Sequence, residues 1–152
     1  MNKYFVGLFL ALTTVDMGMK QYVEESFEKG EKREMIVPKF EFRRVHNRGF
    51  FLNALDKYPA VIKSVSAILG VVIAVLDYQL FTKRGRWGTK LGMTFLSAGA
   101  FSNTFDRIVR GYVVDYFGIR HKNSKLSKIT ANLADLYVLI GSVVLALIYG
   151  KK

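Results

Sequence analysis

The chain has no cysteine and only two histidines among its 152 residues. Without thiols it can form no disulfide, no zinc-thiolate site and no thiol nucleophile, and its side chains offer no site for thioether lipidation. Both histidines, His46 and His121, lie among basic residues, which is unfavourable for metal binding. We therefore expect neither a metal site nor a cofactor. The sequence also shows no internal repeat and no low-complexity tract.

Acidic residues are scarce, with 12 against 23 lysines and arginines, for a net charge of +11. In a soluble protein this excess would suggest nucleic-acid binding. Here 51% of the residues are hydrophobic and the mean hydropathy is +0.18, so the charges must be separated from long apolar stretches. A basic surface beside such stretches indicates attraction to anionic lipid headgroups. We expect phospholipid as a partner and no nucleic acid.

Four apolar stretches have the length of membrane-spanning helices. A helix needs about 20 residues to cross roughly 30 Å of hydrocarbon. The predicted spans are, approximately, 4–23, 61–81, 91–107 and 129–149. The second holds Lys63 and Asp77 as its only charged residues, and the fourth holds only Asp135. The first and third are interrupted by charges but have the same apolar character.

The first apolar stretch follows Lys3 and has the appearance of a secretory signal. We expect an uncleaved helix, because it lacks a small-residue cleavage site and three more apolar segments follow it. Four spans place both termini on one side. The loop 83–90 has four basic residues and no acid, which predicts a cytoplasmic location for it and for both termini, with Trp87 as an interfacial anchor. The segment 107–128 is also basic and favours the opposite orientation.

The region at about 24–60 is predicted as an insert of mixed charge on the outer side of the membrane. Apolar and other residues alternate over 35–42, and the pattern continues over 43–52, which predicts short strands. The preceding run 24–34 is predicted as a solvated helix end or a loop. The expected fold is a single membrane-embedded all-α domain over 1–152, with short strands in its outer insert.

An ionisable group inside a spanning helix costs about 2.5–3.5 kcal/mol on insertion scales, so it requires a partner or a function. Four aspartates lie in or beside the predicted spans: Asp16, Asp106, Asp115 and Asp135. If the third and fourth spans pack antiparallel, the carboxyls of Asp115 and Asp135 approach one outer boundary. Two such carboxyls hold one proton between them, and this suits peptide hydrolysis. The ionised member takes a proton from water while the protonated member polarises the scissile carbonyl.

Both acids also have structural interpretations. The structural alternative for Asp135 is capping of the fourth helix, but we expect Asn132 in that role and place Asp135 about one and a half turns into the span, too deep for capping. The structural alternative for Asp115 is a snorkelling carboxylate that is paired with Arg107 or Arg110. Spacing by itself leaves these interpretations open.

The other charged residues of the spans are predicted to be structural. Asp16 and Lys20 are four residues apart on one helix face, where an acid preceding a base forms a favourable pair. Asp106 and the adjacent Arg107 end the third span, where we expect a local salt bridge between them or an anchor at the membrane interface. The run 97–102 is rich in small residues and would admit a neighbouring helix at close range.

Five short motifs follow one another along the chain. They are Asp16–Lys20 (DMGMK), Asn47–Phe51 (NRGFF), Ala98–Arg107 (AGAFSNTFDR), Gly111–Tyr116 (GYVVDY) and Asn132–Asp135 (NLAD). In this order they resemble Asp-Gln-x-Thr-Lys, Asn-x-Gly-Ala-Ala-Phe, Gly-Gly-Ala-x-Gly-Asn-x-x-Asp-Arg, Gly-x-Val-x-Asp-Phe and Asn-x-Ala-Asp of signal peptidase II, the bacterial lipoprotein signal peptidase family. Each motif is short, but five in order over four predicted spans make the resemblance specific.

The resemblance implies that Asp115 and Asp135 are the catalytic pair of an aspartic endopeptidase. Its substrates would be prolipoproteins that carry a diacylglyceryl group, from which it removes the signal peptide. The residues implied to line the site or bind substrate are Asn47, Asn103, Arg107 and Asn132. The implied fold adds a small extracytoplasmic β-cradle and a short extracytoplasmic helix or loop to four helices. We expect a monomer in the bacterial cytoplasmic membrane, with its active site near the outer face.

The chain departs from the family in several places: Ala98 and Ser102 replace glycines, Gly18 and Met19 stand where polar residues are usual, and Phe50 and Phe51 replace small residues. The first two would push a neighbouring backbone outward unless something compensates, and the two phenylalanines would narrow the substrate groove. The pair of acids is retained. Two alternatives remain: a peptidase of the same mechanism with another substrate, and a non-catalytic lipid-binding scaffold, against which the retained acids argue.

Overall fold

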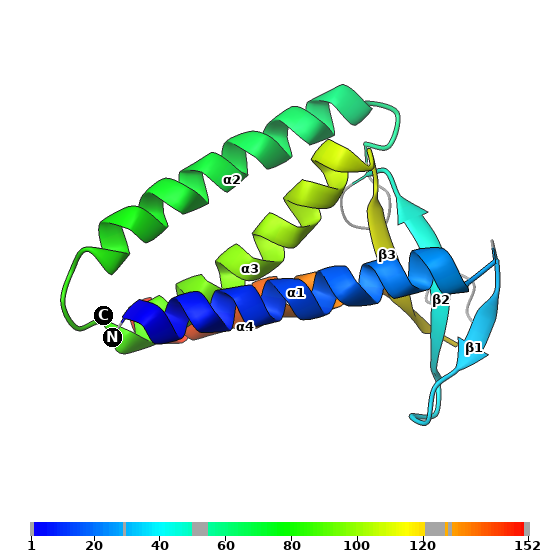
Figure 1. The fold of residues 1–152 in the computed structure, drawn as a ribbon, viewed down its shortest axis with the longest axis horizontal. Coiled ribbons are helices and arrows are strands. Elements are labelled where there is room, and N and C mark those ends of the chain that lie inside the picture. The colour runs from blue at the N-terminus through cyan, green and yellow to red at the C-terminus, as the bar shows by residue number, and fades with distance from the viewer. Residues whose placement is uncertain (1, 29, 50–54, 121–126, 128, 151–152) are drawn as a thin grey trace.

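The computed structural model describes residues 2–28, 30–49, 55–120, 127 and 129–150. Its elements, in chain order, are α1 (Asn2–Ser26), β1 (Lys32–Glu34), β2 (Phe40–Asn47), α2 (Pro59–Phe81), α3 (Trp87–Val109), β3 (Val113–Ile119), β4 (Thr130–Ala131) and α4 (Leu133–Tyr149). Figure 1 shows the four helices running between the same two ends of the molecule, with the sheet across one end. Both termini lie at the other end, beside the connection between α2 and α3.

Each predicted span corresponds to one helix, but the fourth helix starts later than expected. It begins at Leu133 instead of residue 129, because Thr130 and Ala131 pair with β3. Among the helices in the described part of the chain, α2 has the length and hydropathy of a membrane span, with a mean hydropathy of 2.2 over its most apolar window. The apolar helix α4 is shorter, at 17 residues.

Helices α3 and α4 approach each other closely at glycines. A Cβ atom on Gly99 would lie 2.2 Å from the carbonyl oxygen of Ala134, and one on Gly141 would lie 2.6 Å from the carbonyl oxygen of Gly92. Such separations are shorter than real carbon–oxygen contacts, so only glycine fits at these two positions. The expectation that the small residues of 97–102 admit a neighbouring helix is confirmed. This contact also brings the start of α4 against the middle of α3.

The sheet has four antiparallel strands in the order β1-β2-β3-β4, and it differs from the strands predicted for the insert. The predicted strand at 35–42 is wrong over most of its length, because residues 35–39 connect β1 to β2. Strand β1 lies instead in the run predicted as a helix end or loop. Two strands, β3 and β4, come from after α3, where no strand was predicted. Four of the seven residues of β3 are buried in succession, so its sequence lacks the alternation of a half-exposed strand.

Strand β3 separates two environments through the alternation of its side chains. Val114 and Tyr116 are fully buried in a core cluster with Val23 and Phe27 of the α1 end. Successive residues of a strand point to opposite faces, so Asp115 points away from this cluster. The core cluster therefore fixes the sheet to α1 and directs Asp115 to the opposite side.

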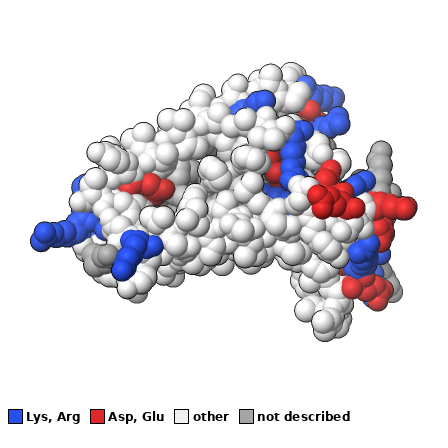
Figure 2. Space-filling model, in the orientation of Figure 1, with Lys and Arg blue, Asp and Glu red and all other residues white. Residues whose placement is uncertain are grey.

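The described residues of the predicted insert contain the end of α1, the strands β1 and β2, a turn, and the start of α2, with no separate helix among them. Residues 50–54 lie outside the described part of the chain, so the groove narrowed by Phe50 and Phe51 stays a prediction. Figure 2 shows that the charged atoms on one face gather towards the two ends of the molecule. Apart from one acidic patch, the surface between the ends is uncharged.

Candidate active site

Asp115 is held by neutral hydrogen-bond donors from three segments of the sheet end. Its Oδ2 accepts hydrogen bonds from the Asn47 side-chain amide at 3.1 Å and from the Thr130 hydroxyl at 3.1 Å. Its Oδ1 accepts one from the Asn132 side-chain amide at 2.9 Å. The side chain is buried, with 1% exposure. The interpretation of Asp115 as a snorkelling carboxylate is therefore wrong, because the group is enclosed by protein.

Asp135 lies in the first turn of α4, where it takes part in a capping box. The Asn132 side-chain oxygen accepts from the Asp135 backbone N–H at 2.9 Å, and Asp135 Oδ2 accepts from the Asn132 backbone N–H at 3.1 Å. The expectation that Asp135 lies too deep for capping is wrong, because pairing of β4 delays the start of the helix. The other oxygen of Asp135, Oδ1, accepts from the Asn103 side-chain amide at 2.9 Å.

Asn132 connects the two acids directly. Its amide nitrogen donates to Asp115, and its amide oxygen accepts from the backbone of Asp135. The same amide nitrogen lies 3.3 Å from the Asn103 side-chain oxygen. A single buried side chain therefore holds the strand that carries one acid against the helix that carries the other.

Burial raises the pKa of Asp115 from 3.8 to about 6, and the negative charge of Asp135 acts in the same direction. The hydrogen bonds from Asn47 and Thr130 oppose this rise because they stabilise the carboxylate. Two acids that repel each other in one site titrate as a pair, because ionisation of one disfavours ionisation of the other. Such a pair can hold one proton between its two members.

Behind the two acids, Lys20 of α1 is completely buried and makes several polar contacts. Its ammonium lies 2.8 Å from Asp16 Oδ2, which confirms the predicted pair, and 3.3 Å from Asp106 Oδ2. It also donates to the Asn103 side-chain oxygen at 2.8 Å. Because an ammonium can only donate, it orients the Asn103 amide so that the amide nitrogen faces Asp135. Lys20, which was predicted to be structural, therefore sets the orientation of Asn103, a hydrogen-bond donor to Asp135 in the candidate site.

Asp16 joins α1 to α3, β3 and α4. Its Oδ1 accepts from the Tyr116 hydroxyl at 2.8 Å and from the Ala134 backbone N–H at 3.1 Å. Its Oδ2 accepts from the Ser102 hydroxyl at 2.6 Å, and that hydroxyl accepts from Lys20 at 3.0 Å. The replacement of the family's glycine by Ser102 is therefore compensated by two side-chain hydrogen bonds that a glycine could not make.

Asp106 does not depend on the neighbour predicted for it. Its carboxylate lies 3.3 Å from Lys20 and 3.3 Å from Arg110, and it accepts from the backbone N–H of Val114 at 3.2 Å. These contacts hold the turn between α3 and β3. Arg107 instead donates to the carbonyl oxygen of Gly49, two residues after β2, at 3.2 Å.

The two acids line one cavity of about 1030 Å³ between α2, α3, α4 and the sheet. Its polar lining includes all six predicted catalytic and substrate-binding residues: Asn47, Asn103, Arg107, Asp115, Asn132 and Asp135. The remaining walls are largely apolar, with Leu69 and Ile73 from α2, Leu96 from α3 and Leu139 from α4. An elongated apolar ligand with one polar group would match this lining.

The structure adds residues that the sequence did not suggest. Thr130 donates to Asp115, and Tyr116 donates to Asp16. Both contacts depend on the tertiary fold, because the partners are 15 or more positions away in the chain. Thr130 precedes the Asn132 motif by two positions. A predicted strand at Thr130, pairing with the segment of Asp115, would have been the sequence signal for this contact. Among the described residues, no three histidine, cysteine, aspartate or glutamate side chains gather closely enough to hold a metal ion.

Comparison with known proteins gives one family. The family described as Signal peptidase (SPase) II matches residues 8–150. A lipoprotein signal peptidase of Allorhizobium ampelinum is 34% identical over 133 residues, which are 88% of this chain and 79% of the relative. A lipoprotein signal peptidase of Clostridium novyi is 28% identical over 133 residues, 88% of each chain. In fold, the chain is similar to a bacterial membrane enzyme solved by the in meso method at 2.3 Å resolution, with a TM-score of 0.83, 19% identity, and coverage of 98% of this chain and 88% of the other.

Proposed function

The chain belongs to the signal peptidase II family of aspartic peptidases, which process lipoprotein signal peptides, and we propose that Asp115 and Asp135 are its catalytic pair. The observation that carries this proposal is the shared cavity, which both acids line and in which Asn132 holds both of them, with Asp115 buried beneath the surface. The raised pKa of Asp115 supports it, because a shared proton is what general acid–base hydrolysis requires.

The proposed reaction is the attack of water on the scissile carbonyl carbon. The ionised carboxylate of the pair removes a proton from the water, while the protonated carboxyl donates a hydrogen bond to the carbonyl oxygen. The resulting tetrahedral intermediate collapses when the leaving nitrogen takes up a proton, and the carbon–nitrogen bond breaks. Asn103 and Asn132 keep the two carboxyls in place throughout, since each donates to one of them.

The proposed substrate is a prolipoprotein that carries a diacylglyceryl group next to the cleavage site. The apolar walls from α2, α3 and α4 would receive the signal peptide and acyl chains, and the polar end of the cavity would receive the scissile peptide. Asn47 and Arg107 line that polar end and are proposed to bind the substrate backbone. Such a substrate stays in the bilayer, which explains why the acids lie beside apolar helices.

We place the protein as a single domain over residues 1–152, with all four helices spanning the bacterial cytoplasmic membrane. Both termini and the basic loop 83–90 lie at one end of the molecule, which supports a cytoplasmic location for that end (Figure 1). The acids then lie near the outer face. We propose a monomer, surrounded by phospholipid.

The test is cleavage of a synthetic diacylated lipobox precursor by the purified protein in detergent, beside an unlipidated control. We expect cleavage of the lipidated precursor alone, and its loss in Asp115→Asn and in Asp135→Asn. Asp77→Asn is the matched control, because Asp77 is a half-buried acid of α2 that accepts a hydrogen bond from Ser97, away from the pair. Cleavage that persists in either of the first two variants would reject the pair. Cleavage of both precursors would indicate a peptidase with another substrate, and no cleavage by the wild-type protein would favour a non-catalytic scaffold.

A further inference from the structure

The connection between β1 and β2, together with the first residue of β2, presents apolar side chains of which a large part is exposed. We call residues 35–40 the hairpin tip. Ile36 is 103% exposed, Val37 53% and Phe40 44%. Figure 2 shows a lobe without charged atoms at the place where Figure 1 draws this connection, to one side of the helices. An exposed apolar cluster of this kind, on a segment that projects from the molecule, marks an interaction surface.

We infer that the hairpin tip inserts into the outer leaflet of the membrane and forms a lipid-facing lip of the cavity that holds the two acids. The inference rests on the proposed orientation, in which the sheet end faces outward. Its partner is lipid, and the contact is made by apolar side chains independently of any bound substrate.

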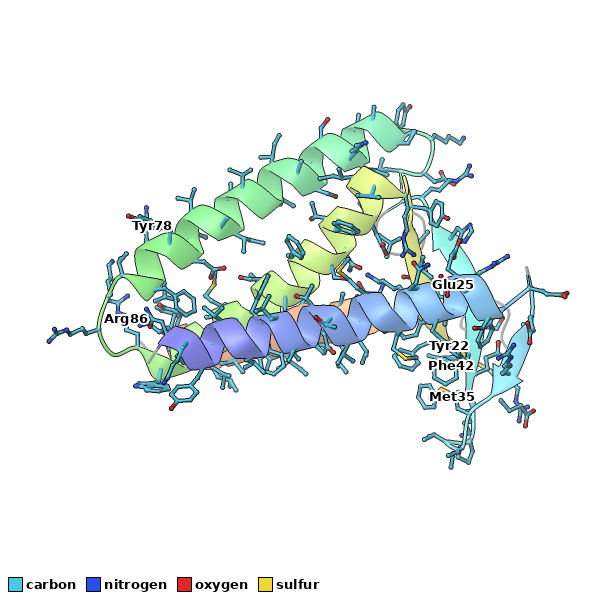
Figure 3. The ribbon with its side chains drawn as sticks, viewed as in Figure 1. Tyr22, Glu25, Met35, Phe42, Tyr78 and Arg86 are labelled. Carbon is cyan, nitrogen blue, oxygen red and sulfur yellow. The ribbon has the colours of Figure 1, made fainter. Side chains whose placement is uncertain are left out.

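The position of the hairpin tip supports lipid as its partner. Met35, Val37 and Phe40 line the same cavity as Asp115 and Asp135. Helix α2, which has the length and hydropathy of a membrane span, contributes another wall of that cavity. The hairpin tip and a helix that we propose to span the membrane therefore border the same cavity. Figure 3 shows Met35 at the sheet end, whereas Tyr78 and Arg86 lie at the opposite end.

The backbone and charge of the hairpin tip also suit a shallow position in a leaflet. The Met35 N–H donates to the Phe40 carbonyl oxygen at 3.2 Å, and the Phe40 N–H donates to the Val37 carbonyl oxygen at 3.3 Å. The Lys39 carbonyl oxygen accepts from the Arg120 N–H at 2.7 Å. Backbone groups that are paired within the protein lower the cost of leaving water. Lys39 is an exposed cation beside the apolar residues, so it can reach a lipid phosphate while they contact acyl chains.

A consequence follows for substrate entry. A diacylated substrate in the outer leaflet would meet the hairpin tip at the mouth of the cavity, because three tip residues belong to the cavity wall. The tip would then raise the occupancy of the site without touching the scissile peptide. Its loss should appear in KM, while kcat should stay unchanged.

The first experiment measures depth in the bilayer and needs no catalysis. Trp87, the single tryptophan, is replaced by Phe, and new tryptophans are placed singly at Ile36, at Val72 in α2 and at Glu28. The variants are reconstituted in nanodiscs with and without lipids brominated on their acyl chains. We expect blue-shifted emission and quenching by bromine for Ile36→Trp and Val72→Trp, and neither for Glu28→Trp, an exposed position before β1.

Three outcomes would overturn the inference. If Val72→Trp is quenched but Ile36→Trp behaves as Glu28→Trp does, the protein spans the membrane and the hairpin tip stays in water. If Val72→Trp is not quenched either, the proposed membrane orientation fails together with the inference. If Ile36→Trp is blue-shifted without quenching and the shift disappears on dilution, a second copy of the chain covers the tip instead of lipid.

The second experiment measures cleavage of a diacylated precursor in the same nanodiscs. We expect Ile36→Asp to raise KM about tenfold with kcat unchanged, because the apolar contact with lipid is replaced by a charge. The matched control is Glu28→Lys, which changes a charge elsewhere on the outer side and should leave both constants unchanged. In detergent micelles, where no leaflet exists, the difference between Ile36→Asp and the wild-type protein should shrink. An equal KM for Ile36→Asp and wild type in nanodiscs would overturn the inference.

Discussion

The molecule contains two groups of acids, and their charges are stabilised by different kinds of partner. Asp16 and Asp106 share the ammonium of Lys20, and Asp106 also contacts Arg110. Asp115 is held instead by neutral amides and a hydroxyl. Burial raises the pKa of Asp115, and the hydrogen bonds from the neutral donors around it oppose this rise without cancelling it. The first group can hold helices together, and the second can exchange protons with a substrate.

Asn103 joins the two groups, since it accepts from Lys20 and donates to Asp135. The ion pairs therefore orient the proton-exchanging site without belonging to it. This separation suggests that changes in the two groups should affect different measurements, and four predictions test it.

The largest effect is expected for the pair itself. Asp115→Asn and Asp135→Asn should each lower kcat by about 10⁴-fold, because an amide can neither remove a proton from water nor share one with its partner. The free energy of unfolding should change little in comparison. The measurement is single-turnover cleavage of the diacylated precursor together with unfolding in mixed micelles. Equal losses of activity and stability would mean that the pair is structural.

The next effect is expected at Lys20 and should have the opposite character. Lys20→Met leaves the buried carboxylates of Asp16 and Asp106 without this cation, and should lower the free energy of unfolding by about 3–5 kcal/mol. The control is Lys3→Met, at an exposed lysine near the start of the same helix. Unchanged stability of Lys20→Met in thermal unfolding would contradict the ion-pair role.

The third prediction concerns pH and stability. The pKa of Asp115 is about 6 in the folded protein against an ordinary 3.8, so the folded state binds more protons than the unfolded state between these values. The contribution of Asp115 to stability should therefore fall as the pH rises from about 4 to about 6, by roughly 3 kcal/mol at most. Asp115→Asn should lose this part of the pH dependence. Parallel pH profiles of unfolding for variant and wild type would show that the pKa is not raised.

The smallest effect is expected at Tyr116. Its hydroxyl donates to Asp16 and accepts from the Leu133 backbone N–H at 3.0 Å, which links the strand of Asp115 to the first turn of α4. Tyr116→Phe should fold, because the ring keeps its place, but should lose about 1–2 kcal/mol of stability. Tyr22→Phe, at a half-exposed tyrosine, is the control and should lose much less. Similar losses of stability in Tyr116→Phe and Tyr22→Phe would contradict a stabilising link between β3 and α4 through the Tyr116 hydroxyl.

The sequence was sufficient to locate the helices and the polar residues of the cavity. Long apolar stretches indicate helices whatever surrounds them, and the six site residues follow from motifs in order along the chain. The strands of the sheet were harder to predict from the sequence. Strand β3 is buried on both faces and therefore lacks alternation, and the two residues of β4 are too few for any pattern.

The errors at Asp135 and Asp106 have a related cause. Whether Asp135 caps α4 depends on where the helix starts, and this is decided by the pairing of Thr130 and Ala131 with β3. The partners of Asp106 are Lys20, 86 positions before it, and Arg110, one helical turn after it. Adjacency in sequence suggested Arg107, but neighbouring residues on a helix point in different directions.

The sequence by itself determined which segments are apolar and which acids lie in or beside them, because hydrophobicity and residue identity are local properties. Only the tertiary structure decided which of these acids contact a cation and which are joined through Asn132. That choice depends on the close approach of α3 to α4 at Gly99 and on the placement of β3 between a core cluster and a cavity. Burial and distance together set the protonation of a carboxyl, and both arise only when segments distant in sequence pack.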